Sequence, residues 1–269
     1  RMDAATRKMF LKKTLDARWN KRAVSIDVPV DAFSSHQFDV GSRFVLRELE
    51  KTGRRWPRTL DMGCGYGYLG LYLAATGLAE QMTGFDRDAL AVAFAGANAK
   101  RNEIGNAAFF PAIAGDADVA GDHDLVVSNV PAKAGEGVHR LMLLGPQRML
   151  AAGGEAAVVV VDPLEAEVDR VLDHPNVTLH DKSRRRGHVV YRYGFTGPVD
   201  LPGRPYLRET GEFAGRGVRY TLEAWHGLAE FDTRTTDTNL LLQLLADHLR
   251  RRTEPCIAIS EPGQGHVAV

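Results

Sequence analysis

The sequence has few cysteines and no cluster of metal-binding side chains. Its 269 residues include two cysteines, Cys64 and Cys256. Because Cys64 lies in a glycine-rich loop, we expect no disulfide framework, and a reducing cytoplasm fits this usage. Cysteine and histidine do not recur at the spacing of zinc ligands, so we expect no metal site.

The sequence also lacks a charge excess and a long apolar run. Lysine plus arginine and aspartate plus glutamate both number 34, so net charge does not demand a nucleic-acid partner, although a local basic cluster could serve one. No apolar run reaches about 18 residues, which excludes a membrane-spanning helix. Residues 1–13 lack an apolar signal core, so secretion is not indicated. The length suits one large domain or one and a half ordinary ones.

The most informative stretch is LDMGCGYGYLG at residues 60–70, which is typical of a buried strand, a glycine turn and the start of a helix. Glycines allow unusual backbone conformations and close approach of a ligand, and helix N-termini favour anionic or polar groups. The pattern Gly65-x-Gly67-x-x-Gly70 fits a dinucleotide fingerprint. The pattern Asp61-x-Gly63-x-Gly65-x-Gly67 fits a methyltransferase motif that binds S-adenosylmethionine (SAM), and a purely structural turn is the third interpretation.

Apolar segments alternate in type along the chain. We expect strands at 58–62, 81–85, 107–113, 124–128 and 156–161, and two last strands at 177–180 and 188–193 that pair antiparallel. Helices are expected at 68–75, 89–101, 136–152 (split at Gly145-Pro146 and stopped by Gly153-Gly154) and 165–172. This alternation predicts an α/β fold, a doubly wound, mostly parallel seven-stranded sheet that is Rossmann-like.

The residues ahead of this region form a lead-in. We expect a helix over 2–22 with Met9, Phe10 and Leu15 on its buried side, then a strand at 23–30. A polar turn with Asp39 as helix cap precedes a helix at 41–51, whose apolar face is Phe44, Val45 and Leu49. Such a turn can fold over a cofactor site.

Polar residues follow the ends of the second and third strands. Asp86, 23 residues beyond Gly63 (86 − 63), can hold both hydroxyls of a ribose, which suits NAD and SAM equally. Asp88 serves better than Asp86 as the cap of the next helix. Asp116 and Ala117 could bind an adenine amino group through a side chain and the backbone, or be solvated loop residues.

The segment Ser128-Asn129-Val130-Pro131 discriminates between these alternatives. The Asn129 side-chain oxygen and the next backbone carbonyl can both accept hydrogen bonds from a planar amino group, in the bend fixed by Pro131. That arrangement holds a nucleophilic nitrogen in line with a sulfonium methyl, which is catalysis by positioning. An NAD enzyme has no need of it, although Asn-x-Pro also suits a plain strand-ending turn.

With these residues, the chain over about residues 30–195 resembles the class I SAM-dependent methyltransferases. It is most similar to the ribosomal-RNA guanine-N2 methyltransferase (small-domain) family, whose Phe-Ser…Asp-x-Gly-(Ser/Thr) segment is matched by Phe33-Ser34 and Asp39-Val40-Gly41-Ser42. Val130 and Ala132 depart from that family's Asn-Pro-Pro-aromatic motif, which removes a base-stacking contact of about 1–3 kcal/mol. The resemblance implies SAM as cofactor and two sets of site residues. The catalytic pair is Asn129 and Pro131, and the cofactor set is Phe33, Ser34, Asp61, Gly63, Cys64, Gly65, Gly67, Asp86, Arg87, Asp116, Ala117 and Asn129.

The C-terminal region repeats the beginning of the pattern. Phe231 and Asp237 follow Phe33 and Asp39 at an offset of 198 (231 − 33, 237 − 39), a helix is expected at 240–249, and residues 256–266 echo the glycine stretch at an offset of 200. We therefore expect a lead-in at 1–57, a SAM-binding core at 58–196, and the start of a degenerate second repeat at 197–269. The natural protein would continue, or this tail would pack as an accessory unit. Val267 replaces Gly67, so we expect no second SAM site.

Four functions stay open. The first is a SAM-dependent methyltransferase for a nitrogen in RNA, such as a ribosomal guanine, and the second is a methyltransferase for a small molecule or a protein side chain. The third is an NAD-linked nucleotide-binding protein, and the fourth is a non-catalytic scaffold. The basic clusters at 182–186 and 250–252 are either solvated faces or RNA contacts.

Overall fold

The computed structural model describes residues 2–30, 32, 37–115, 119, 121–215, 218–226 and 235–249 of the protein. The chain divides into two units. The first comprises Arg1–Ala132 and His139–Leu201, and the second comprises Lys133–Val138 and Pro202–Val269. None of the described helices is long and apolar enough to span a membrane.

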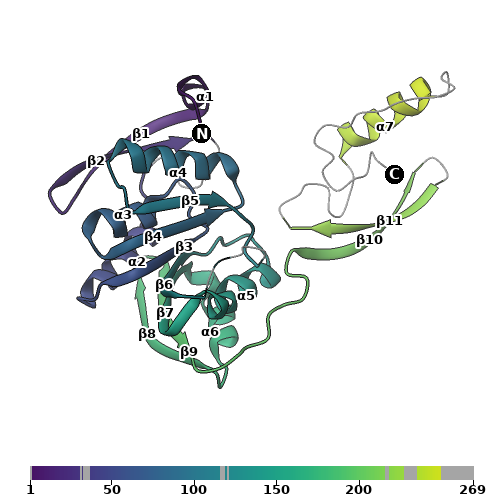
Figure 1. Ribbon diagram of the computed structural model, residues 1–269. Helices are drawn as coiled ribbons and strands as arrows, with labels where there is room; N and C mark the ends of the chain where they lie inside the picture. The colour runs from purple at the N-terminus through teal and green to yellow at the C-terminus, as the bar shows by residue number, and fades with distance from the viewer. Residues whose placement is uncertain are drawn as a thin grey trace. The chain divides into compact units, whose positions relative to one another are not determined.

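A seven-stranded sheet is the centre of the first unit (Figure 1). Its spatial order is β5-β4-β3-β6-β7-β9-β8, and β9 alone runs antiparallel to its neighbours. This confirms the predicted α/β fold with a doubly wound, mostly parallel sheet. The strands are β3 (Trp56–Met62), β4 (Ala79–Asp86), β5 (Ala107–Pro111), β6 (His123–Asn129), β7 (Leu150–Val161), β8 (Val177–Arg185) and β9 (His188–Phe195).

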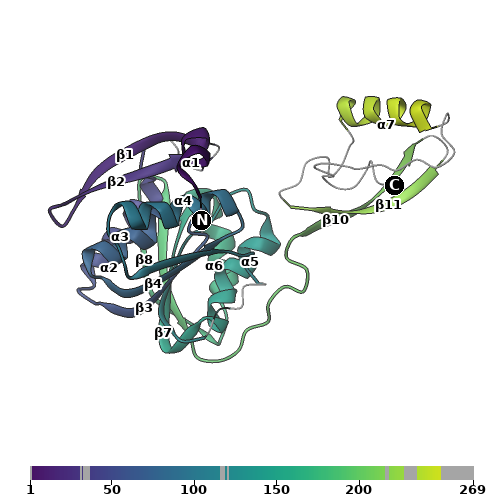
Figure 2. The ribbon, with the colours of Figure 1, turned by 45° about the horizontal axis from the view of Figure 1, so that its top comes forward.

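Helices cover both faces of this sheet (Figure 2). Residues 156–160 of the central strand β7 are apolar and at most 1% exposed, as expected where a parallel sheet is buried on both sides. One face carries α2 (Val40–Lys51), α3 (Tyr68–Thr76) and α4 (Ala89–Arg101), and the other carries α5 (Glu136–Leu144) and α6 (Glu165–Leu172). The predicted helix boundaries at 89–101 and 165–172 are confirmed.

The strand order reverses between β3 and β6. After β3 the chain adds β4 and β5 on one side, then returns to place β6 on the other. Ser128 of β6 donates from its hydroxyl to the Met62 carbonyl of β3 at 2.7 Å, which joins the carboxyl ends of the two strands. Ligands of doubly wound sheets bind beyond the strand ends at such a switch point.

The predicted helix over residues 2–22 is wrong after its first two turns. Helix α1 (Ala4–Phe10) is followed by an antiparallel hairpin of β1 (Leu11–Trp19) and β2 (Arg22–Pro29). Met9, expected to be buried, is 76% exposed, whereas Phe10 and Leu15 pack against the core. The apolar spacing of this stretch is compatible with either structure, and pairing with β2 decides for the strand because it satisfies the backbone of both.

Helix α4 holds the hairpin through two asparagines. The Asn98 side chain accepts from the Asp27 backbone N–H at 2.8 Å and donates to the carbonyls of Asp27 and Tyr66 at 2.9 and 3.1 Å. Asn102 makes the same pair of bonds with the backbone of Ser25, at 2.8 and 2.9 Å. Asn98 therefore ties the hairpin and the glycine turn, which contains Tyr66, to one helix.

The predicted helix over 136–152 is correct at its start and wrong at its end. Helix α5 stops at Leu144, a short 3-10 helix η1 (Gly145–Arg148) follows, and β7 begins at Leu150. Pro146 splits the helix as expected. Gly153 and Gly154, expected to stop the helix, instead lie within β7, because that strand extends well beyond its apolar run.

The second unit contains a hairpin, β10 (Leu207–Gly215) and β11 (Val218–Trp225), and helix α7 (Thr236–Leu249). These elements repeat the lead-in at one offset: Leu11 to Leu207, Arg22 to Val218 and Val40 to Thr236 all differ by 196. Both hairpins join a nine-residue to an eight-residue strand, and both shift register after the first residue of the first strand. These elements share a constant offset of 196, whereas the pairings at 198 and 200 found from the sequence include Phe33, Phe231 and 256–266, which lie outside the described residues.

The two helices, α2 and α7, also begin with the same kind of side-chain cap. The Asp39 carboxylate accepts from the Ser42 backbone N–H in α2, and the Thr235 hydroxyl accepts from the Thr238 N–H in α7, again 196 residues apart (235 − 39, 238 − 42). At the apolar positions Phe44, Val45, Leu46 and Leu49 of α2, the same offset places Leu240, Leu241, Leu242 and Leu245 of α7. The α2 side chains are buried, whereas Leu240 and Leu241 are 53% and 44% exposed.

Candidate active site

The glycine turn between β3 and α3 takes backbone conformations that side chains disfavour. Gly63, Gly65 and Gly67 have φ of 78°, 53° and 92°. A Cβ on Gly67 would lie 3.0 Å from the Cβ of Ala95, whereas no described atom lies within 4 Å of a Cβ on Gly65. The turn is thus tight against α4 at Gly67 and open at Gly65, where the backbone can meet a ligand.

Asp61, at the end of β3, is fully buried beside this turn. Its Oδ2 accepts from the Gly70 backbone N–H at 2.9 Å, while Oδ1 has no hydrogen-bond partner within the described residues. Burial raises the pKa of the Asp61 carboxyl from 3.8 to about 7, with a further contribution from the nearby charge of Asp86. A buried carboxylate with one unpartnered oxygen fits a ligand that brings a positive charge or N–H donors.

Asp86, at the end of β4, supports the turn from the other side. Its Oδ2 accepts from the Gly65 backbone N–H and its Oδ1 from the Asp88 N–H, both at 2.9 Å. Each carboxylate oxygen can accept a second bond, so ribose hydroxyls can still be held. Asp88 caps α4, as the sequence suggested, by accepting from Leu90 and Ala91. Arg87 is exposed.

Cys64 is buried within the turn. Its backbone N–H donates to the Phe85 carbonyl at 3.0 Å, and the Gly63 N–H donates to the same carbonyl at 2.9 Å. Burial raises the pKa of the Cys64 thiol well above its ordinary value, so the thiol stays protonated. The residue contributes its backbone to the turn, and its sulfur is not a nucleophile.

Asn129 lies at the carboxyl end of β6, next to β3. Its Nδ2 donates to Asp39 Oδ2 at 2.8 Å and to Ser42 Oγ at 3.0 Å. The first turn of α2 and the tip of β6 therefore meet, 90 residues apart in the sequence. The sequence indicated Asp39 as a cap and Asn129 as a ligand-binding residue, but nothing in it indicated that the two would bind each other.

Val130 and Pro131 continue from Asn129. The Val130 N–H donates to the Val159 carbonyl at 3.0 Å, and the Val130 side chain is buried. The Pro131 carbonyl is 3.0 Å from Nε2 of buried His139, whose Nδ1 is 2.8 Å from Glu167 Oε1. His139 thus holds the bend after Asn129 from α5, with Glu167 of α6 fixing its ring, a role that the sequence did not indicate.

Four predicted cofactor residues, Phe33, Ser34, Asp116 and Ala117, lie outside the described residues. So do the glycine-like turn at 261–266 and the basic cluster at 250–252.

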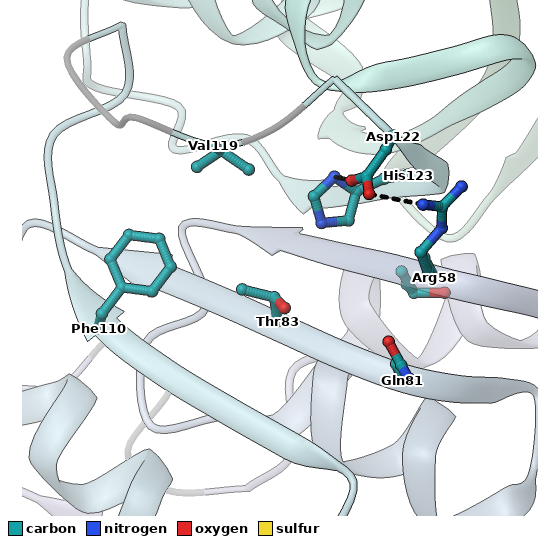
Figure 3. A pocket seen from close by; sticks show the side chains of 8 residues that line it. Arg58, Gln81, Thr83, Phe110, Val119, Asp122 and His123 are labelled. Atoms are coloured by element: carbon teal, nitrogen blue, oxygen red, sulfur yellow. Dashed lines mark hydrogen bonds and ion pairs between the residues drawn. The ribbon is translucent and has the colours of Figure 1, made fainter.

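Two hollows are found in the first unit. A cavity of about 300 Å³ is lined by Arg58, Gln81, Phe110 and His123 among others, toward the amino-terminal half of the strands (Figure 3). It lies on the face of α5 and α6, where no helix is described between β5 and β6. A smaller hollow of about 150 Å³ lies near Met62 and Leu141. Neither is lined by Asp61, Asp86 or Asn129.

The basic cluster at 182–186 begins in β8 and is partly neutralised by acids around α6. Lys182 Nζ lies 3.0 Å from Glu165 and 2.8 Å from Asp169, and Arg184 Nη2 lies 2.7 Å from Glu165. Two of its four basic residues are therefore engaged within the fold, which favours the interpretation of a solvated face.

The sequence profile of the methyltransferase small domain family matches residues 24–192. The protein therefore belongs to this family and has its fold. This decides the ambiguity of the glycine pattern against the NAD interpretation.

Two groups of curated relatives are similar to the chain. It is 36% identical over 133 residues to ribosomal RNA large subunit methyltransferase G of Streptomyces coelicolor, which covers 47% of the chain and 35% of the relative. It is 29% identical over 162 residues to ribosomal RNA small subunit methyltransferase C of Chromohalobacter salexigens, covering 55% and 46%. The chain thus spans between a third and a half of the length of these relatives.

Two solved structures share the fold. The 16S rRNA N2 methyltransferase RsmC of T. thermophilus, in complex with AdoMet and guanosine, has a TM-score of 0.56 at 20% identity, covering 68% of this chain and 50% of that chain. A ribosomal protein L11 methylase of Lactobacillus delbrueckii has a TM-score of 0.51 at 19% identity, covering 58% and 79%. At these identities the likeness concerns the fold alone.

Proposed function

We propose that the protein transfers the methyl group of SAM to a nitrogen acceptor, and that this acceptor is an amino group of a base in ribosomal RNA. The observation that carries the proposal is the meeting of three strand tips at the switch point. Asp86 of β4, Asp61 of β3 and Asn129 of β6 stand at the ends of adjacent strands, around the open side of the glycine turn.

The residues present fit SAM. The unpartnered Oδ1 of Asp61 suits the positively charged amino-acid end of the cofactor, the open backbone at Gly65 suits close approach, and Asp86 suits the ribose. When bound, the cofactor supplies a sulfonium methyl as the electrophile. Phe33, Ser34, Cys64, Arg87, Asp116 and Ala117 complete the proposed cofactor set through backbone or side chain.

Asn129 and Pro131 orient the acceptor. The Asn129 Oδ1 and the backbone carbonyl after it accept hydrogen bonds from the acceptor amino group, and Pro131 fixes the bend. These bonds hold the nitrogen lone pair toward the methyl group, and the nitrogen loses its proton after the new bond has formed. No strong base is required for this order of events.

The ribosomal acceptor is supported by the names of the similar proteins, which include ribosomal RNA methyltransferases G and C. A second candidate, a small-molecule or protein nitrogen, is favoured by one observation. Val130 and Ala132 provide no aromatic side chain to stack on a base.

The test is methyl transfer from labelled SAM to three separate pools: ribosomal RNA, protein and small metabolites. Asn129→Ala is assayed beside the wild type. Asn106→Ala is the matched control, because Asn106 donates to the Glu80 carbonyl at the amino-terminal ends of the strands, away from Asn129. We expect label in RNA, a loss of at least about 100-fold in Asn129→Ala and no change in Asn106→Ala. Label confined to protein or metabolites would select the second candidate. Absence of SAM binding by calorimetry would refute the proposal.

The proposal extends to the organisation of the chain. Residues 1–57 are a lead-in that covers the cofactor site, 58–196 are the SAM-binding core, and 197–269 begin a degenerate second methyltransferase-like repeat. The offset of 196 shared by β1 and β10, β2 and β11, and α2 and α7 supports the repeat.

A further inference from the structure

The side-chain amide of Asn129 is held through its nitrogen, Nδ2. Its Nδ2 carries two hydrogens, and it makes two hydrogen bonds, to Asp39 Oδ2 and to Ser42 Oγ. Both donors are therefore used within the protein. Within the described residues, no hydrogen bond to Asn129 Oδ1 is found, so this oxygen is left to accept from an acceptor amino group.

The carboxylate of Asp39 decides which end of the amide faces it. A carboxylate accepts hydrogen bonds and donates none, so turning the amide by 180° would place Oδ1 against Asp39 Oδ2 with no hydrogen between them. That arrangement replaces a charge-assisted bond by repulsion. Asp39 thereby selects the amide orientation in which Asn129 Nδ2 faces α2 and Asn129 Oδ1 is turned away from it.

Asp39 is itself fixed by the helix that it caps. Its Oδ2 accepts from the Ser42 backbone N–H at 2.6 Å, and its carbonyl accepts from the Arg43 N–H at 3.0 Å. Gly41 leaves room beside it, because a Cβ there would lie 2.8 Å from His188 Cδ2 and 3.1 Å from Asp39 Oδ2. The segment Asp39-x-Gly41-Ser42 is therefore hydrogen-bonded and closely packed beside Asn129.

From these contacts we infer that Asp39, with Ser42, is a positioning residue that locks the Asn129 amide with its oxygen toward the acceptor. Helix capping is the second role of the same carboxylate. The inference rests on the proposed function for its kinetic consequence, whereas the locking of the amide stands on the contacts themselves.

The two roles of Asp39 can be separated by Asp39→Ser. Serine is as good a helix N-cap as aspartate, and the Thr235 hydroxyl caps α7 at the equivalent position. A serine side chain is one carbon shorter and cannot bridge to Asn129 in the same way. Asp3→Ser is the matched control, because Asp3 caps α1 through the Thr6 N–H at 2.8 Å and supports no site residue.

The first measurement is kinetic. We expect Asp39→Ser to lower kcat by roughly 10- to 100-fold with an unchanged dissociation constant for SAM and a similar Tm, since misplacement of about 1 Å can cost about 100-fold. In the Asn129→Ala background the same change should lower kcat no further, because Asp39 acts through Asn129. Asp3→Ser should leave kcat unchanged in both backgrounds.

The second measurement does not depend on turnover. The Asn129 side-chain amide is assigned in a ¹H–¹⁵N spectrum by its loss in Asn129→Ala. Its two protons should exchange with solvent slowly in the wild type and in Asp3→Ser, and faster in Asp39→Ser.

Faster exchange in Asp39→Ser confirms the lock, even if no pool is methylated and the proposed function fails. Unchanged exchange overturns the inference. Equal losses of kcat with and without Asn129, or a loss that follows SAM affinity or Tm, overturn it as well, because they would assign Asp39 a structural role alone.

Discussion

Asp61 carries a buried carboxyl whose pKa is raised by burial to about 7, against 3.8 for the unfolded chain. Between pH 4 and pH 7 the unfolded state has lost this proton while the folded state keeps it, so the free energy of unfolding falls as pH rises through this range. We expect Asp61→Asn to remove this decline, which amounts to on the order of 3–4 kcal/mol at most. Denaturant unfolding of both proteins from pH 4 to pH 8 measures the difference, and parallel curves would contradict the assignment.

The titration of Asp61 should also affect ligand binding, and there the pH dependence has the opposite sign. A cationic ligand at Asp61 favours the carboxylate, so SAM affinity should rise as pH increases through 7 and binding should release protons. Calorimetry in buffers of different ionisation enthalpy counts these protons in the wild type, and Asp61→Asn should release fewer.

Gly67 combines a left-handed backbone with close neighbours. Its φ of 92° costs a non-glycine residue about 1–2 kcal/mol, and the contact with Ala95 at 3.0 Å adds to that. We expect Gly67→Ala to lower the free energy of unfolding by more than about 2 kcal/mol and to abolish SAM binding.

Gly53→Ala is the control for this change. Gly53 has a similar φ of 65°, but no described atom lies within 4 Å of its Cβ position. It should lose about 1 kcal/mol from backbone strain alone and keep its SAM affinity. Equal effects of the two substitutions, measured by urea unfolding and calorimetry, would show that strain alone matters.

At the scale of elements, α4 organises the site although it supplies no ligand-binding side chain. Asn98→Ala leaves the Asp27 backbone groups and the Tyr66 carbonyl without partners, at about 1–3 kcal/mol for each buried group. We expect it to lower the free energy of unfolding by roughly 2–4 kcal/mol and SAM affinity about 10-fold, because the glycine turn loosens.

Asn102→Ala tests whether loosening of the glycine turn causes the loss of SAM affinity expected for Asn98→Ala. Asn102 holds the hairpin at Ser25 without touching that turn. It should therefore lower stability but leave SAM affinity close to that of the wild type. An equal loss of affinity in both variants would mean that the hairpin, and not the turn, controls the cofactor site.

At the scale of the whole molecule, the two units use similar helices in different surroundings. Val45 of α2 is fully buried, whereas Leu241 of α7, 196 residues later, is 44% exposed. We expect Val45→Lys to lower the free energy of unfolding by about 3–5 kcal/mol and Leu241→Lys to change it by less than about 0.5 kcal/mol. Circular dichroism during urea unfolding measures both, and a large effect of Leu241→Lys would show that this face of α7 is buried in the folded protein.

The sequence by itself determined the order and type of most elements of the first unit. Strands with continuous apolar runs and helices with clear caps, such as 89–101, were predicted closely because their local pattern and their packing agree. The places of the glycine turn, Asp61, Asp86 and Asn129 at the carboxyl ends of strands could be predicted for the same reason.

The tertiary structure alone decided what depends on distant partners. Residues 11–19 became a strand because β2 pairs with them, and Gly153 and Gly154 lie in β7 where its pairing with β6 shifts register between Leu150 and Glu155. The contacts of Asn129 with Asp39, of His139 with Pro131, and of Asn98 with Tyr66 join residues up to 90 positions apart. A hydrogen bond between distant residues leaves no periodicity in the chain, so folding had to bring them together before their roles could be seen.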